Sequence, residues 1–281
     1  MLLNDALSTT LRIEAGRSAW PLSPVSVWRY RYVFYRLLLR DFQVRYRQTL
    51  IGVGWAVMQP LITMLIFTFT LGHIAKFESG NMPYSIFCLA GLVLWTFFSN
   101  CLLHGGISVY ENSNLIRQAY FPREFLPLTV CAVKLIDLAV GFALLLVWSA
   151  YLHPIRWTPQ LLLFPIYLGL GIVMTVGAVL FVSALCAQFP DVRYALPFLT
   201  QILFFATPIV YALGSIQTEK YRWVLLINPL TAWIDSIRQI LFGHYTASLL
   251  FLGCFAAMSV GLLAIGCLYF RNVQRSFSDT L

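Results

Sequence analysis

Long apolar runs separated by short polar segments are the dominant pattern of this chain. A helix that crosses the hydrocarbon core of a bilayer needs about 20 mainly apolar residues, and six stretches match that requirement. The predicted membrane spans are residues 55–72, 84–103, 125–151, 161–187, 196–213 and 247–270. Because their number is even, we expect both ends of the chain to face the same side of the membrane.

The segment before the first predicted span has two helical stripes. One stripe is mainly aromatic, with spacings that alternate between four and three residues. The other stripe is basic and lies about 100° round the helix. An aromatic stripe beside an arginine stripe is typical of a helix that lies in the membrane interface, and the alternative is an ordinary packed amphipathic helix. The stripes consist of Trp28, Tyr32, Tyr35, Leu39, Phe42 and Tyr46, and of Arg29, Arg36, Arg40 and Arg47.

Residues 213–246 are too polar and interrupted to form a complete span, although residues 223–227 and 230–234 are apolar. The short apolar pieces meet at Asn228 and Pro229, where a helix would be interrupted. We expect two half-helices that dip back into the outer leaflet, where such backbone is tolerated only against protein or a water-filled cavity. A folded outer loop is the alternative.

These patterns together predict an all-α membrane protein with six transmembrane helices, an N-terminal interfacial amphipathic helix and re-entrant half-helices before the last span. Residues 1–27 lack a long apolar core and carry charges such as Asp5 and Arg12, so they do not read as a secretory signal. We expect residues 1–27 to be a cytoplasmic tail, residues 28–50 the interfacial helix and residues 51–281 the six-span domain.

Composition agrees with the membrane interpretation. The chain is 59% hydrophobic and 11% charged, whereas soluble domains carry about 25% charged residues. The net charge of +8 could point to nucleic acid in a soluble protein, but here the basic residues lie mostly at the ends of apolar segments. We therefore expect membrane lipids, and no nucleic acid, among its partners.

The distribution of Lys and Arg predicts the orientation, because basic residues concentrate on the cytoplasmic side. With the N-terminus inside, cytoplasmic segments hold many more basic residues than outer segments. The cytoplasmic set is Arg12, Arg17, Arg29, Arg31, Arg36, Arg40, Arg45, Arg47, Arg117, Arg123, Arg193, Arg271 and Arg275, and the outer set is Lys76, Arg156, Lys220, Arg222 and Arg238. Both termini are therefore expected in the cytoplasm.

Familiar catalytic patterns are missing from the sequence. None of the lysines, Lys76, Lys134 and Lys220, follows a glycine-rich loop, so a P-loop for ATP is excluded. The sequence has no HExxH or GxSxG pattern. Its 6 cysteines lack CxxC spacing, which supports buried small side chains rather than disulfides or zinc. We expect a non-enzymatic transport subunit with no cofactor or metal of its own, driven by a partner or an ion gradient.

Two ionisable residues, Lys134 and Asp137, lie clearly inside a predicted span. They are three residues apart, so they can pair on one helix face. This spacing favours a structural ion pair, and a role in transport is the alternative because charges inside membranes often mark an ion path.

Four motifs resemble those of a known family. They are the stretch ENSNLIRQAYFPRE at Glu111 to Glu124, FPDVRYALPF at Phe189 to Phe198, NPLT at Asn228 to Thr231, and GVGWAVMQP at Gly52 to Pro60. Together they resemble the permease subunit of ABC exporters for O-antigen, teichoic acid and related glycans, from about Trp28 to the C-terminus. Capsule exporters share this architecture.

The resemblance implies a bacterial inner-membrane protein with six spans that forms a homodimer with a second copy of itself. It also implies a separate cytoplasmic ABC ATPase that holds ATP and magnesium. The cargo would be a polysaccharide on an undecaprenyl-pyrophosphate-type lipid, which would pass through a channel at the dimer interface.

We predict three groups of functional residues. The first cytoplasmic loop should dock into the ATPase, with a solvated loop as the alternative. Arginines at the inner headgroup level should meet the lipid pyrophosphate, because guanidinium groups match phosphate oxygens, and nearby glycines would allow a close approach. General attraction to anionic lipids is the alternative there. The docking residues are Glu111, Asn114, Arg117, Arg123 and Glu124, and the pyrophosphate residues are Arg40, Arg45, Arg47, Gly52 and Gly54.

The third group would line a glycan channel. Sugar rings present apolar C–H faces that stack on aromatic side chains, by analogy with the stacking of bases along single strands. Aromatic residues also gather at membrane interfaces for other reasons. The candidates are Trp95, Phe97, Phe98, Phe204, Phe205, Tyr211 and Trp233.

Other functions remain possible on the sequence. One is an ABC permease of the same architecture that moves a capsular polysaccharide, a lipid or a drug. Another is an ion-coupled secondary transporter or channel, which would work without an ATPase and would show internal repeats. A membrane-bound glycosyltransferase is a third, although no acidic pair is available for its metal.

Overall fold

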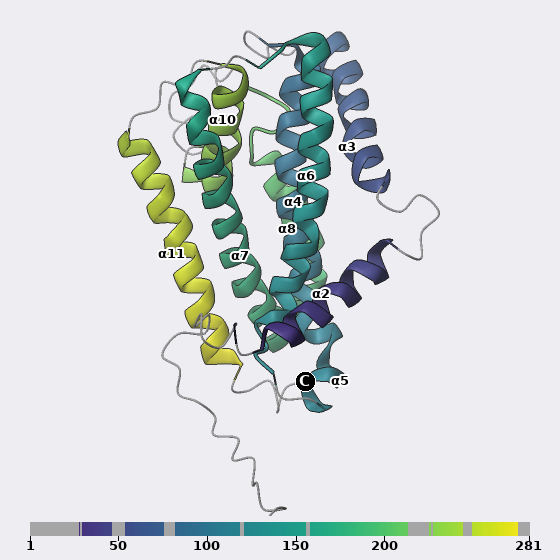
Figure 1. Cartoon of the computed structure of the whole chain (residues 1–281), viewed down its shortest axis with the longest axis vertical. Helices are drawn as coiled ribbons and strands as arrows, with labels where there is room; N and C mark the ends of the chain where they lie inside the picture. The colour runs from purple at the N-terminus through teal and green to yellow at the C-terminus, as the bar shows by residue number, and fades with distance from the viewer. Residues whose placement is uncertain are drawn as a thin grey trace, which may run out of the picture.

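The computed structural model describes residues 28, 30–46, 54–75, 82–118, 121–155, 158–212, 225, 227–243 and 249–274. Within these residues the chain forms helices and no strands (Figure 1). The elements are α2 (Arg31–Tyr46), α3 (Gly54–Phe67) with a π-helical continuation η1 (Thr68–Ile74), α4 (Tyr84–Glu111), α5 (Ser113–Gln118), α6 (Phe125–Leu152), η2 (Pro159–Leu163), α7 (Phe164–Gln188), α8 (Pro190–Phe205), α10 (Pro229–Phe242) and α11 (Leu249–Val273).

Five helical segments are long and apolar enough to cross a membrane, which confirms the all-helical membrane class. They are Gly54–Ile74, Tyr84–Glu111, Phe125–Leu152, Pro159–Gln188 and Leu250–Val273. The remaining predicted span, residues 196–213, corresponds to α8, which ends at Phe205. Its 16 residues are about 24 Å long at 1.5 Å per residue, which is shorter than the hydrocarbon core.

The turns that follow α8 continue in the same direction. The Tyr84 hydroxyl, at the start of α4, donates a hydrogen bond to the Val210 carbonyl at 2.6 Å. Helix α8 begins two residues after α7 ends, whereas Val210 lies beside the start of α4. Helix α8 and the turns after it therefore extend from one end of the bundle toward the other. In Figure 1, α2 and the C-terminal end of α11 lie at the same lower end of the bundle. The sixth crossing itself stays a prediction.

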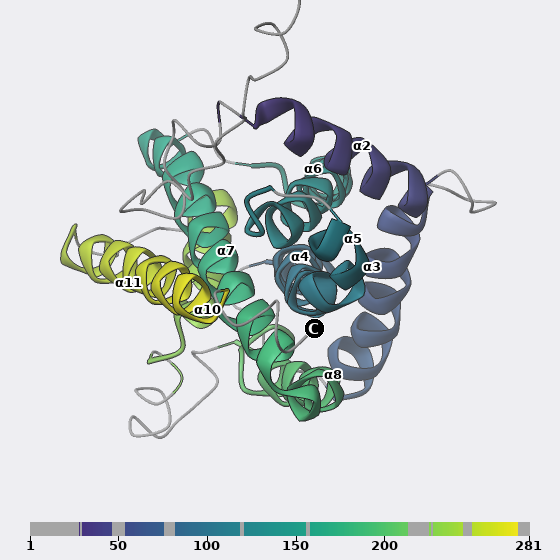
Figure 2. The same ribbon diagram turned by 90° about the horizontal axis from the view of Figure 1, so that it is seen from below.

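Helix α4 lies at the centre of the bundle, with α3, α6, α7 and α8 around it (Figure 2). In its most apolar 18-residue window, 78% of the residues are buried, whereas the corresponding window of Gly54–Ile74 is only 11% buried. A helix that is apolar all round needs neighbours or lipid on every side. Helix α4 therefore packs mainly against protein, and α3 leaves most of its surface outside the fold of the single chain.

Glycines allow α7 and α11 to touch backbone to backbone. A Cβ atom added at Gly266 would lie 2.2 Å from the Gly177 carbonyl oxygen, and one added at Gly177 would lie 2.5 Å from the Leu263 nitrogen. Small residues serve this purpose between membrane helices, because close backbone packing replaces the hydrophobic effect inside lipid.

Helix α10 is buried between α4 and α7 although it is only 14 residues long. Asn228 caps its first turn by accepting a hydrogen bond from the Leu230 nitrogen at 3.0 Å. The fully buried Trp233 packs on Gly171 of α7, where an added Cβ would lie 1.9 Å from the indole ring. The re-entrant interpretation of this segment stays a prediction. The first half falls mostly outside the described residues.

Arg238 fixes the other end of α10. Its guanidinium donates hydrogen bonds to the carbonyls of Pro208 and Ile209 and lies 3.7 Å from the centroid of the Phe87 ring. Gly91 of α4 makes room for this group, because a Cβ atom there would lie 2.1 Å from an Arg238 nitrogen and 2.9 Å from the Ile209 carbonyl oxygen.

We predict that Gly91→Ala destabilises the protein by about 1–3 kcal/mol, the usual range for overpacking a core, because the Ile209 carbonyl is backbone and cannot rotate away. Gly253→Ala is the matched control, since a Cβ at Gly253 would meet nothing within 4 Å. Melting of the two purified variants in the same detergent measures the difference. Equal melting temperatures would show that Arg238 and the turn adapt without cost.

Candidate functional site

Two polar contacts hold α2 against α6. The Thr129 hydroxyl donates to the Asp41 carboxylate at 2.9 Å, and Arg40 also binds Asp41. Further along α2, Arg45 and the Tyr46 hydroxyl both donate to Asp137. From Thr129 to Asp137 is about 12 Å along α6, so α2 climbs along α6 as it approaches α3.

The first part of the predicted aromatic stripe is exposed, whereas its last member, Tyr46, bonds inward to Asp137. Trp28, Tyr32 and Tyr35 are exposed. The guanidinium groups of Arg31 and Arg36 stack over the Trp28 and Tyr32 rings, at 4.7 and 6.0 Å from the centroids. The opposite face packs Leu37 into a cluster with Phe125 and Leu126. This two-faced arrangement is suited to the headgroup layer of a membrane.

The structure corrects the predicted ion pair. Among the described residues, Asp137 forms its ion pair with Arg45 and not with Lys134. Lys134 is buried near the thiols of Cys101 and Cys131. The three-residue spacing on α6 predicted that Asp137 would pair with Lys134. In the structure Asp137 accepts from both Arg45 and Tyr46 of α2 instead. The sequence analysis had predicted no contact between α2 and α6.

A small cavity of about 20 Å³ lies beside this ion pair, between α2, α3, α4 and α6. It lies where α2 approaches the beginning of α3. It is lined by Arg45, Ala56, Gln59, Pro60, Val93, Thr96, Phe97, Asn100, Asp137, Leu138 and Gly141.

The residues predicted to meet a lipid pyrophosphate are only partly described. Arg47 and Gly52 lie outside the described residues, and Gly54 begins α3. Arg40 is paired with Asp41, and Arg45 is paired with Asp137. An incoming phosphate would therefore have to compete with a carboxylate for either of these arginines.

The predicted docking loop forms the short helix α5 and the turns around it. Glu111, at the end of α4, and Asn114 and Arg117 of α5 are exposed. Leu115 and Ile116 point the other way, into the cluster that contains Leu37 of α2. Helix α5 and α2 therefore share one apolar cluster, through which a movement of α5 could reach α2.

The other two predicted docking residues face inward. Arg123 donates to the Gln274 carbonyl at the end of α11, where a positive charge also matches the helix dipole. Glu124 is only 5% exposed, and burial raises its pKa. These residues tie the loop to α11 in the single chain, so the exposed docking residues are Glu111, Asn114 and Arg117.

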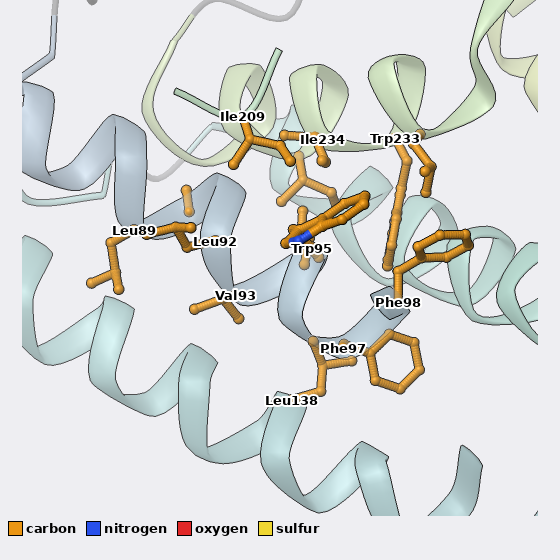
Figure 3. Close-up of a cluster of buried hydrophobic side chains, with 14 of the residues drawn as sticks. Leu89, Leu92, Val93, Trp95, Phe97, Phe98, Leu138, Ile209, Trp233 and Ile234 are labelled. Carbon is orange, nitrogen blue, oxygen red and sulfur yellow. The ribbon is translucent and has the colours of Figure 1, made fainter. Parts of the chain in front are cut away.

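The predicted channel aromatics divide into two groups. Trp95, Phe97, Phe98 and Trp233 are buried in the core (Figure 3), so none of them is exposed on the outside of the single chain. They fill the space around α4, whose apolar sequence does not reveal which side faces protein. Phe205 is 65% exposed, and Phe204 and Tyr211 are partly exposed.

Sequence reasoning missed further exposed aromatics on α8. Tyr194 and Phe198 are 85% and 64% exposed and share the outer face of α8 with Phe205. Their spacing of four and seven residues is a signal for one helix face. The sequence analysis also did not identify the structural role of Arg238. A buried arginine is costly inside a membrane, so an arginine in an apolar segment indicates a specific contact.

Comparisons with known proteins agree on one family. The family model described as ABC-2 type transporter matches residues 32–242. The chain is 26% identical over 257 residues to the O-antigen export system permease protein RfbA of Myxococcus xanthus, covering 91% of this chain and 97% of the relative. A Klebsiella pneumoniae protein of the same name is 27% identical over 244 residues, covering 84% and 91%. The polysialic acid transport protein KpsM of Escherichia coli is 24% identical over 247 residues, covering 85% and 93%.

We predict that Asp137→Asn loosens α2. Loss of the charge leaves Arg45 without its ion-pair partner, at a cost on the order of 1–3 kcal/mol, so local opening of α2 becomes more frequent. Trypsin cleavage after the arginines of α2 should accelerate about tenfold or more, since a tenfold change corresponds to about 1.4 kcal/mol. Asp191→Asn, at an exposed aspartate in the first turn of α8, is the control. Unchanged cleavage in Asp137→Asn would show that apolar packing alone holds α2.

We predict that Glu124→Gln becomes more stable relative to the unaltered protein as pH rises. Folding raises the pKa of Glu124, so the folded chain binds this proton more tightly than the unfolded chain. The unaltered protein therefore loses stability as pH rises from the ordinary glutamate range through the raised pKa. Glutamine does not ionise, so it escapes this loss. Melting temperatures at about pH 4 and pH 7 test the trend, and a constant difference between the two proteins would contradict it.

Proposed function

We propose that this chain, which belongs to the ABC-2 type transporter family, is the permease subunit of an ATP-driven polysaccharide exporter. Its cargo is an undecaprenyl-linked glycan, O-antigen or a related cell-surface polysaccharide, moved across the bacterial inner membrane. The observation that carries this proposal is the match to O-antigen export permeases along almost their whole length. The five apolar helices support the same function.

The energy source is a cytoplasmic ABC ATPase that docks on α5 and holds ATP and magnesium. Glu111, Asn114 and Arg117 form the exposed docking surface. Two contacts can pass movement onward. Leu115 and Ile116 pack toward α2, and Arg123 holds the end of α11. Coupling requires such rigid contacts between two sites.

The lipid pyrophosphate enters near the junction of α2 and α3. The supporting observations are the exposed aromatic and basic face of α2 and the two arginines further along this helix, Arg40 and Arg45. Both arginines are paired with carboxylates, which keeps them oriented before cargo arrives. A phosphate with two charges can displace a single carboxylate from a guanidinium fork.

A homodimer supplies the channel in this proposal. Helix α3 leaves most of its apolar surface uncovered. Helix α8 stands beside α3, since Phe67 and Phe204 stack at 6.1 Å, and it exposes Tyr194, Phe198 and Phe205. A second copy could cover part of this surface, and the remaining aromatics would serve as platforms for sugar rings. Both termini face the cytoplasm in this arrangement, as the distribution of basic residues indicates.

The similarity to a polysialic acid transport protein favours one alternative cargo, a capsular polysaccharide. An O-antigen and a capsular chain differ in linkage and charge, whereas the architecture of the permease would be the same. The alternative therefore changes the glycan and not the roles of α2, α5 and α8.

We predict that a tagged copy of this chain co-purifies with the ABC ATPase encoded beside it and carries ATP hydrolysis activity. Glu111→Ala combined with Arg117→Ala should reduce the co-purified activity at least fivefold, because it removes both charged exposed groups of the docking surface. Arg36→Ala, an exposed arginine on the lipid face of α2, is the control.

Cells lacking the gene should accumulate the lipid-linked glycan on the cytoplasmic side, which identifies the cargo. Transport by the purified chain alone in liposomes, without any ATPase, would overturn the proposal and favour an ion-coupled carrier.

A further inference from the structure

Lys134 of α6 is a buried basic residue without an ion pair. Its side chain is only 3% exposed, and it forms no ion pair within the described residues. Its electrostatic neighbours are Arg45 of α2, Asp137 of its own helix, and the thiols of Cys101 and Cys131. Because an unpaired charge is costly inside a membrane, a lysine at this position indicates a role that packing alone does not require.

The charges around Lys134 do not cancel. Arg45 and Lys134 are two basic side chains, and Asp137 is the one carboxylate among the described residues that acts on both. His104 of α4 lies within electrostatic reach of the same three groups, and an imidazole can add positive charge but not negative charge. The cluster therefore holds more basic groups than acidic ones, which favours an additional anion from outside.

Arg45 is the basic group that such an anion can reach. The Arg45 side chain is 30% exposed, whereas that of Asp137 is 10% exposed and Lys134 is buried. The Nε atom of Arg45 is buried and has no hydrogen-bond partner, so the pairing with Asp137 leaves part of the guanidinium fork unused. A phosphate group can bind that fork through two parallel hydrogen bonds.

Asp137 opposes the transfer of Arg45 to an anion. Without Arg45, Asp137 would keep the Tyr46 hydroxyl but would become a buried carboxylate without a basic partner, which is strongly destabilising. Lys134 can remove this obstacle. It precedes Asp137 by three residues on α6, a spacing at which side chains of one helix meet, and its flexible stem allows the ammonium group to turn.

We propose that Lys134 is a positioning residue for a lipid pyrophosphate: it takes over Asp137 when the pyrophosphate takes Arg45. No buried ion is then left without a partner, and release of the pyrophosphate returns Arg45 to Asp137. The choice of a lipid pyrophosphate as the anion rests on the proposed function. The exchange itself depends only on the charges and positions of these three side chains.

The exchange is tested with undecaprenyl pyrophosphate, which carries the anionic headgroup and no glycan. The full chain is purified in a zwitterionic detergent, and native mass spectrometry measures the bound fraction over a titration. Lys134→Met replaces the ammonium group with an apolar side chain. Lys134→Met combined with Asp137→Asn also removes the carboxylate that Arg45 would leave behind. Arg193→Met, at a partly exposed arginine of α8, removes one positive charge elsewhere and is the matched control.

Lys134→Met should weaken binding by about tenfold or more, because binding then leaves Asp137 unpaired. The double variant should bind at least as well as the unaltered chain, and Arg193→Met should bind equally well. Melting temperatures without lipid should not fall in Lys134→Met, whereas a purely structural lysine would lower them. Equal binding by Lys134→Met, no rescue in the double variant, or equal weakening in Arg193→Met would each overturn the exchange.

Two competitors identify the anion. Phosphatidylglycerol carries one phosphate on a bilayer lipid, and inorganic pyrophosphate has no lipid, so neither should displace undecaprenyl pyrophosphate at equal concentration. Equal competition by either would reject the lipid pyrophosphate as the specific anion. Absence of binding to the unaltered chain would reject Arg45 as an anion site, and the exchange with it. None of these measurements needs the ATPase, whose failure to co-purify would count against the proposed function alone.

Discussion

The guanidinium group of Arg238 connects three segments that are far apart in the sequence. It is carried by α10, it stacks on Phe87 of α4, and it donates to the carbonyls of Pro208 and Ile209 after α8. Those carbonyls belong to a turn that has left helical geometry, so they need an outside donor. The buried charge and the open carbonyls therefore compensate each other. The position of α10, and with it the packing of Trp233 on Gly171, depends on this mutual satisfaction.

The sequence predicted the helical class and the positions of five of the six spans, because hydrophobic period and length are local properties. The span at 196–213 differs because Pro190 starts α8 early and the helix stops at Phe205. Side-chain orientation was harder to predict. On α4 almost every position is apolar, so Trp95, Phe97 and Phe98 could not be separated from exposed aromatics without knowing that α4 lies at the centre. The pairing of Arg45 with Asp137 links residues 92 positions apart, a distance at which no periodicity gives information.

The cytoplasmic end of the bundle joins its parts through short direct contacts. Helix α5 packs toward α2 through Leu115 and Ile116, and the turn that leads from α5 into α6 holds α11 through Arg123. A cation–π contact connects the beginning of α8 to the end of α4: the Arg193 guanidinium lies 3.5 Å from the centroid of the Tyr110 ring. These contacts lie close to the exposed residues of α5. One displaced element there would act on α2, α8 and α11 without a long chain of intermediates.

The seating of Trp233 against Gly171 has a mechanical consequence. The Trp233 ring packs directly against the backbone at Gly171. Sliding of α10 along α7 would bring this ring into steric conflict with neighbouring side chains. Together with the close backbone contact of Gly177 and Gly266, it makes α4, α7, α10 and α11 one stiff body. Helix α3 is held by far less buried surface. Movement of α3 would therefore break fewer contacts within the single chain than movement of any of these four helices.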